Sequence, residues 1–147
     1  TSGYIFTFGN NVISWYSGRQ PVVALSTAEA EYIAVTSAAQ EAIWLKSLVE
    51  SLGYVQRTII LHEDNQACIA LSKNPQDHKR TKHIQVRFHF VRDLVSDGII
   101  ELSFVHTKHQ LADICTKALN GSAHRTQLSK IGHIKTDHQS RRQLKYD

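Results

Sequence analysis

Helical patterning runs without a break from Ser26 to Leu52 and stops at Gly53, a residue type that commonly follows the end of a helix. Within this segment apolar side chains recur at helical spacing and form one stripe. The stripe consists of Ala34, Val35, Ala38, Ala42 and Leu45. A long helix with one apolar face buries that face against another layer, so we expect the remaining segments to supply a sheet.

Strand patterns lie on both sides of this helix. Before it, "GYIFTFG" and "VISWYSG" are aromatic and β-branched runs separated by Asn10 and Asn11, which tolerate the positive φ of a tight turn. These two runs predict an antiparallel hairpin. Two further strand patterns follow the helix, "RTIILHE" at 57–63 and "IIELSFVHT" at 99–107.

Three more helical patterns alternate with these strands. "DNQACIALSKN" precedes Pro75, a residue that helices avoid in their interior, and the basic "HKRTKHIQVRFHFVRDLVSDG" runs to Gly98. "HQLADICTKAL" spans 109–119. The order hairpin, helix, strand, helix, helix, strand, helix predicts an α/β fold with a mixed sheet.

The net charge of +4 lies outside the patterned body. The 147 residues fit one domain, and the segment from Asn120 onward carries six Lys and Arg against two Asp, so residues 1–119 are neutral overall. We therefore divide the chain into a domain at 1–119 and a basic tail at 120–147. We expect the tail to be mostly flexible, apart from a short patterned stretch at 127–134.

No apolar run approaches the roughly 20 residues of a membrane span, and the N-terminus lacks the layout of a secretion signal. Cys68 and Cys115 lie in apolar helical patterns, which is typical of small core residues and not of a disulfide framework. We expect a soluble intracellular protein with no membrane partner. The absence of methionine and the hairpin-like start at Thr1 lead us to expect a fragment of a longer protein.

Two glutamates open the long helix, and they have different explanations. Ser26 and Glu29 have the spacing of a capping box, in which each side chain accepts a hydrogen bond from the other's backbone N–H. Glu31 instead lies on the apolar stripe, where a lone carboxylate is costly unless a cation or hydrogen-bond donors meet it. The alternative for Glu31 is a position at the helix edge from which the carboxylate reaches water.

Two aspartates, like Glu31, lie near the ends of predicted elements or in a predicted helix, where each has a functional and a structural explanation. Asp64 follows the strand at 57–63, where ligands of open α/β sheets gather, although Asp is also a common N-cap. Asp113 lies inside the helix predicted at 109–119, past the turn that capping would explain, and a solvated helix face is its alternative. With Glu31 they indicate three carboxylates at one sheet edge, the oxygen-rich ligand set of Mg²⁺ and of two-metal phosphoryl chemistry.

Four longer motifs carry a family resemblance. They are "TSGYIFTFGNNVISWYSGRQPVVALSTAEAEYIAV", "EDNQACIALSKNP", "HKRTKHIQVRFHFVRDLV" and "QLADICTKAL". In order and spacing they resemble the ribonuclease H domain at the C-terminal end of copia-type retrotransposon Pol polyproteins, over residues 1–119, with a looser similarity in "HRTQLSKIGHIKTD". The resemblance implies a ribonuclease H-like mixed sheet flanked by helices. It also implies an endonuclease that cuts the RNA strand of an RNA–DNA hybrid during reverse transcription.

The resemblance further implies a cofactor and its ligands. The family uses two Mg²⁺ ions, for which Mn²⁺ substitutes, held by four carboxylates. The second, third and fourth carboxylates fall on Glu31, Asp64 and Asp113. The first is an Asp on a strand upstream of the "TSGY" motif, a strand that occupies the middle of the family's sheet. This sequence has no counterpart of it, so we expect the first, central strand to be missing, and enzymatic activity of this chain stays open.

A basic cluster provides candidates for phosphate contacts with the hybrid, and a solvated helix face is the alternative. The cluster consists of Lys79, Arg80, Lys82, His83, Arg87 and Arg92. The resemblance also implies the upstream reverse transcriptase domain of the same polyprotein as a partner. From the family's life cycle, the expected location is a cytoplasmic virus-like particle or the nucleus.

Two histidines flank the segment that carries Asp113. Relatives usually have proline at the position of His106, and His106 and His109 could assist proton transfer or product release or could be surface residues of a loop. No Cys-x-x-Cys motif accompanies the histidines, so we expect no structural zinc site. Two other functions stay open: a non-catalytic remnant of a decayed retroelement that at most binds nucleic acid, and an inert fold without a partner.

Overall fold

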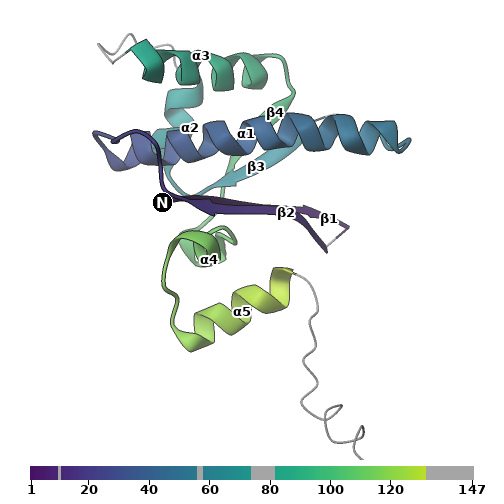
Figure 1. Cartoon of the computed structure of the whole chain (residues 1–147), viewed down its shortest axis with the longest axis vertical. Coiled ribbons are helices and arrows are strands. Elements are labelled where there is room, and N and C mark those ends of the chain that lie inside the picture. Colours follow the sequence, from purple (N-terminus) through teal and green to yellow (C-terminus); the bar gives the residue numbers. More distant parts are fainter. Residues whose placement is uncertain (10, 56–57, 74–81, 132–147) are drawn as a thin grey trace, which may run out of the picture.

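The computed structural model of the chain describes residues 1–9, 11–55, 58–73 and 82–131. Within these ranges the fold is mixed α/β, with two small sheets and five α-helices (Figure 1). The α/β class predicted from the sequence is therefore confirmed. The single mixed sheet is not observed, because the strands form two separate pairs.

The predicted hairpin is present. Strands β1 (Ser2–Phe8) and β2 (Asn11–Gly18) pair antiparallel, and the register shifts between Phe6 and Thr7. The turn differs from the prediction, because Asn11 is already the first residue of β2. Gly9 supplies the positive φ of 55°, while Asn10 lies outside the described residues.

Helix α1 (Thr27–Ser51) matches the predicted helix closely. Ser26 is its N-cap, and the Ser26 hydroxyl accepts a hydrogen bond from the Glu29 N–H at 3.1 Å. The return bond differs from a capping box, because Glu29 Oε2 accepts from the N–H of Leu25 at 2.7 Å. Gly53, with φ of 88°, follows the helix in the left-handed conformation expected of a helix-terminating glycine.

The second half of the fold is a parallel pair with helical connections. Strands β3 (Ile59–Glu63) and β4 (Ile100–Phe104) pair in parallel, and α2 (Gln66–Lys73) and α3 (Lys82–Ser96) connect them. One hydrophobic core joins these elements to α1. It contains Tyr32, Val35, Ala39, Ala42, Leu61, Cys68, Phe88, Val91, Leu94, Ile100 and Leu102.

The helix predicted at 109–119 is wrong in its extent. A 3₁₀ turn at Thr107–His109 comes first, Gln110 adopts an extended conformation, and only α4 (Asp113–Thr116) is helical. Figure 1 shows α1 to α3 on one side of the strands and α4 on the other.

Helix α5 (Gly121–Ile131) lies beyond α4 and begins earlier than the patterned stretch expected at 127–134. Asn120 explains this start, because its Oδ1 atom accepts a hydrogen bond from the Ala123 N–H at 2.9 Å, as an N-cap does. The tail predicted to be mostly flexible therefore contains a helix as far as Ile131, and residues 132–147 lie outside the described part of the chain. Among the described residues no helix is both long and apolar enough to cross a membrane.

Candidate active site

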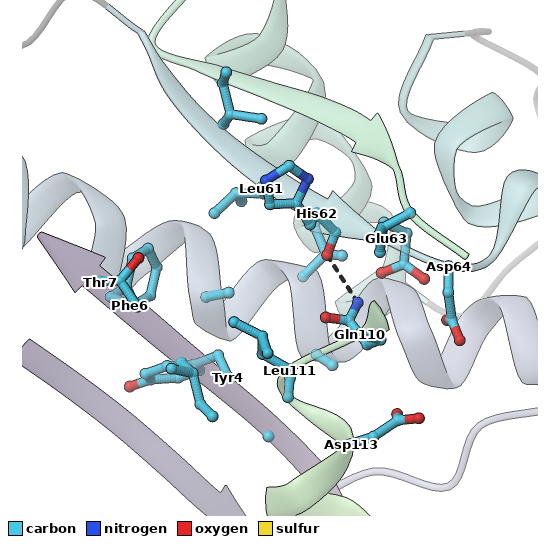
Figure 2. A pocket seen from close by; sticks show the side chains of 18 of the residues that line it. Tyr4, Phe6, Thr7, Leu61, His62, Glu63, Asp64, Gln110, Leu111 and Asp113 are labelled. Carbon is cyan, nitrogen blue, oxygen red and sulfur yellow. Dashed lines mark hydrogen bonds between the residues drawn. The ribbon is translucent and has the colours of Figure 1, made fainter. Parts of the chain in front are cut away.

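A cavity of about 790 Å³ separates the two sheets. Strand β1 lines one side and β3 the other, while Ala34 and Ala38 of α1 contribute small side chains to its wall. Figure 2 shows Leu111 from the loop before α4 lying between the two strands. In the described part of the chain, β1 pairs only with β2 and β3 only with β4, so each strand has one unpaired edge beside the cavity.

Backbone groups of β3 face this cavity. The Ile59 N–H bonds to Ile99 O, and the Val105 N–H bonds to Glu63 O. Alternate residues of a parallel strand point their backbone groups to opposite sides, so those of His62 point away from β4. The Gln110 side chain bonds to one of these groups: its Nε2 atom donates a hydrogen bond to His62 O at 3.0 Å (Figure 2).

The three predicted carboxylates all line this cavity. Glu31 comes from the start of α1, Asp64 directly follows β3, and Asp113 is the first residue of α4. Burial raises the pKa of Glu31, and the nearby charges of Asp64 and Asp113 raise it further. The structure thus brings together three acidic residues that are far apart in the sequence.

Asp64 does not cap the helix that follows it. The N-cap bond of α2 comes from Asn65, whose Oδ1 atom accepts from the Cys68 N–H at 3.1 Å. The capping alternative for Asp64 is therefore wrong. The half-buried Asp64 side chain instead lines the cavity.

Asp113 occupies a different position in its helix from the one predicted. It lies in the first turn of α4 and not in a helix interior. The solvated-face alternative is also wrong, because Asp113 is only 8% exposed. Its Oδ1 atom accepts from Lys117 Nζ at 2.8 Å, and this hydrogen bond raises the pKa of Lys117.

Sequence reasoning missed Glu63, a fourth carboxylate beside the cavity. Glu63 is 5% exposed, and burial raises its pKa to about 7 although the Asn65 N–H, which donates to Glu63 Oε1 at 2.9 Å, opposes the shift. Glu31 and Asp64 raise the pKa further. The signal was present, because Glu63 is two residues after the buried Leu61 and so points to the same face of β3.

The donor set fits Mg²⁺ in its chemistry, since all three predicted ligands are carboxylates and Mg²⁺ prefers oxygen. The spacing does not form a finished centre. Among the described residues, no group of three or more His, Cys, Asp or Glu side chains is placed so that it could hold one metal ion. The Lys117 ammonium lies 2.8 Å from Asp113 Oδ1.

The structure describes only part of the predicted phosphate-binding cluster. Lys79 and Arg80, and the side chains of Lys82 and His83, lie outside the described part. The lining of the cavity does not include Arg87 or Arg92. Within α3, Arg92 donates from Nε to Phe88 O at 3.3 Å and contacts His89 Nδ1 at 3.1 Å.

The two histidines before Asp113 have distinct local contacts. His106 accepts a hydrogen bond from the Lys108 N–H at 3.3 Å and so caps the 3₁₀ turn. His109 lines the cavity, and its Nδ1 atom lies 3.2 Å from Lys130 Nζ. Desolvation and the Lys130 charge lower the pKa of His109, which favours the neutral ring, whose Nδ1 atom can accept a hydrogen bond from that ammonium.

Sequence comparison connects the chain to transposons. It is 45% identical over 119 residues to the retrovirus-related Pol polyprotein from transposon TNT 1-94 of Nicotiana tabacum, a match that covers 81% of this chain. Relatives that match most of this chain are retrovirus-related Pol polyproteins. The corresponding polyprotein from transposon RE1 of Arabidopsis thaliana is 40% identical over 133 residues, or 90% of this chain. The Gag-Pol polyprotein of transposon Ty1-NL2 from Saccharomyces cerevisiae is 31% identical over 120 residues, or 80% of this chain.

These Pol homologues are much longer than the chain. The matches span 9%, 9% and 7% of the three polyproteins, so the chain corresponds to a small part of each. No protein-family model matches the chain, and no solved structure matches it significantly. The similarities support a retroelement origin and a place within a larger Pol polyprotein.

Proposed function

We propose that this chain is the ribonuclease H part of a copia-type retrotransposon Pol polyprotein and hydrolyses the RNA strand of RNA–DNA hybrids during reverse transcription. The observation that carries the proposal is the convergence of Glu31, Asp64 and Asp113 on one cavity. The Pol homologues support a retroelement origin, and the family resemblance implies reverse transcription, which produces this hybrid substrate. An upstream reverse transcriptase domain is the proposed partner, and a cytoplasmic virus-like particle or the nucleus is the proposed location.

The three carboxylates would hold two Mg²⁺ ions, or Mn²⁺ in their place. Such ions, when bound, stabilise the negative charge that develops on the attacking and leaving oxygens during phosphodiester hydrolysis. The protein contributes the placement of its own groups. Half-burial of Glu31 and burial of Asp113 reduce the surrounding water, which strengthens the attraction of these carboxylates for a cation.

The cavity between the sheets is also part of the proposal. Neighbouring strands in a sheet lie about 4.8 Å apart, so two facing unpaired edges can accept one strand between them. The family resemblance implies such a central strand, with a fourth carboxylate on it. Small side chains at Ala34 and Ala38 support this arrangement, because they let a strand pack closely on α1. We propose that this strand joins β1 to β3 and completes the ligand set.

Binding of the hybrid is proposed to use phosphate contacts from the basic cluster at 79–92. Arg87 and Arg92 belong to α3, which Figure 1 shows across α1 from the hairpin, and neither lines the cavity. These contacts would therefore bind a part of the hybrid at a distance from the carboxylates. Charge reversal at Arg87 should weaken hybrid binding and its salt dependence, as expected for a phosphate contact.

The test is cleavage of a labelled RNA–DNA hybrid in Mg²⁺ by the 147-residue chain and by a version extended upstream by one Asp-bearing strand. The extended protein should cut the RNA strand, and Asp64→Asn within it should abolish cutting. Asp93→Asn is the matched control, because Asp93 is an exposed carboxylate on α3. The proposal would be overturned if the extended protein is folded, as judged by its circular dichroism spectrum, and does not cut the hybrid.

A second candidate is a non-catalytic retroelement remnant that at most binds nucleic acid. The observation in its favour is that, within the described ranges, no three potential ligands are placed so as to hold a metal ion. This candidate predicts that the extended protein binds the hybrid and leaves it intact. Filter binding of uncut hybrid, measured beside the cleavage assay, separates the two functions.

A further inference from the structure

Lys117 is a cation beside the three carboxylates, and the sequence analysis gave it no role. Its Nζ atom lies 2.8 Å from Asp113 Oδ1, across one turn of the chain. The Lys117 side chain is 51% exposed, whereas that of Asp113 is 11% exposed. The ammonium therefore covers the solvent side of a largely buried carboxylate.

The influence of this ammonium extends beyond Asp113. The charges of Asp64 and Glu31 add to the effect of Asp113 in raising the pKa of Lys117. In the other direction, Lys117 counters the burial and the neighbouring acids that raise the pKa of Glu31. One side chain thus acts electrostatically on carboxylates from three separate elements.

Three carboxylates at one partly buried place repel one another unless a cation is present. Glu31, Asp64 and Asp113 come from the start of α1, the end of β3 and the start of α4. Their repulsion would push these elements apart around the cavity. A cation attached to the chain offsets that repulsion without any bound ion, and a half-exposed lysine is also free to swing into water.

We propose that Lys117 is the built-in counter-ion of this site and competes with a divalent cation for Asp113. The ammonium must leave Asp113 Oδ1 before a metal ion can bind that oxygen. This inference rests on the proposed function, because the competing ion is the Mg²⁺ or Mn²⁺ proposed above. It also accounts for the arrangement of the carboxylates. They have the chemistry of Mg²⁺ ligands, but among the described residues no three are placed so that they could hold one metal ion.

The test is binding of Mn²⁺ to the full chain and to Lys117→Gln, measured by isothermal titration calorimetry. Lys117→Gln removes the charge and keeps a polar side chain, so it should bind Mn²⁺ roughly threefold or more tightly than the wild type. In EDTA the same variant should melt at a lower temperature, because the carboxylates lose their counter-ion. Lys117→Arg keeps the charge and should retain the wild-type affinity.

Lys46→Gln is the matched control. Lys46 and Glu50 form another pair four residues apart, with an Nζ to Oε1 distance of 2.7 Å. Lys46 is about 22 Å along α1 from Glu31 at the usual helical rise, so its loss should leave Mn²⁺ affinity unchanged.

The outcomes separate this inference from the proposed function. Equal Mn²⁺ affinity of the wild type and Lys117→Gln would keep the metal site and overturn the role of Lys117. Weaker binding by Lys117→Gln would overturn it too, because Lys117 would then assist the ion. If neither protein binds Mn²⁺, the three carboxylates of this chain do not hold the ion by themselves, and competition at Asp113 is overturned, while the cleavage test of the extended protein still decides the proposed function.

Discussion

The Nε2 atom of Gln110 donates a hydrogen bond to the backbone oxygen of His62 at 3.0 Å and so ties the loop before α4 to the unpaired edge of β3. Helix α5 joins the same connection, because Gln127 Nε2 donates to Gln110 O at 3.1 Å. Gln110 therefore links three elements around Asp113.

Replacing Gln110 should loosen this connection. Gln110→Ala removes the bond to His62, and we expect the free energy of unfolding to fall by about 1 kcal/mol. Amide hydrogen exchange of residues 110–127 should become faster, since the segment loses its attachment to β3. Both are measurable by urea denaturation and exchange mass spectrometry. Gln40→Ala, on the exposed surface of α1, should change neither, and an equal effect of the two variants would contradict the prediction.

Glu63 should make stability depend on pH. Burial raises its pKa from 4.5 to about 7, so between these values the folded protein holds a proton that the unfolded chain has lost. The free energy of unfolding should therefore fall as the pH rises from about 4.5 to about 7, by at most roughly 3 kcal/mol from this group. Urea denaturation at several pH values in EDTA measures this slope.

Glu63→Gln should flatten the slope and be more stable than the wild type at pH values above that range. Glu101→Gln provides the comparison, because Glu101 is an exposed glutamate on β4. If the full slope persists in Glu63→Gln, another group binds the extra proton.

Asn65 should contribute to stability as the N-cap of α2. Asn65→Ala removes the bond to the Cys68 N–H, and caps of this kind contribute about 1 kcal/mol. Since Cys68 belongs to the core, the loss should lower the midpoint of global unfolding in urea. Asn120→Ala removes the corresponding cap of α5, which lies outside the core, and should mainly reduce the helical signal before unfolding. The reverse pattern would disprove this assignment.

The two cysteines should react at different rates. Cys68 is 0% exposed and Cys115 is half-buried, and burial raises the pKa of both thiols. With a thiol reagent such as Ellman's at pH 8, Cys115 should react slowly and Cys68 only after unfolding. Cys115→Ser should then show no reaction without urea. Similar rates for the two thiols in the native protein would contradict the buried position of Cys68.

The parts of the fold that were predicted from the sequence have strong local signals. Helix α1 has a capping serine at Ser26 and a terminating glycine at Gly53, and the hairpin has β-branched and aromatic residues on both arms. The helix predicted at 109–119 failed for a tertiary reason. Gln110 is held extended by partners on β3 and α5, which no local pattern reveals.

The residues of the candidate site were also predicted only in part. The helical stripe correctly placed Glu31 on the cavity side of α1, because helical spacing depends on the sequence alone. Lys117 was missed although it lies four residues after Asp113 in the predicted helix at 109–119, the spacing of an ion pair on a helix. The division of the strands into two sheets was also beyond local patterns, because sheet pairing joins residues far apart in the chain.

The parallel pairing of β3 with β4 has a consequence for folding kinetics. The hairpin joins Ser2 to Gly18 and needs only a short loop to close, whereas Ile59 pairs with Ile100, and that closure has a larger entropic cost. Contacts between distant residues form slowly, so the hairpin and α1 should order first. Asp64 and Asp113 follow the ends of this late-forming pair, and we therefore expect the acidic cluster to assemble after the hairpin and α1.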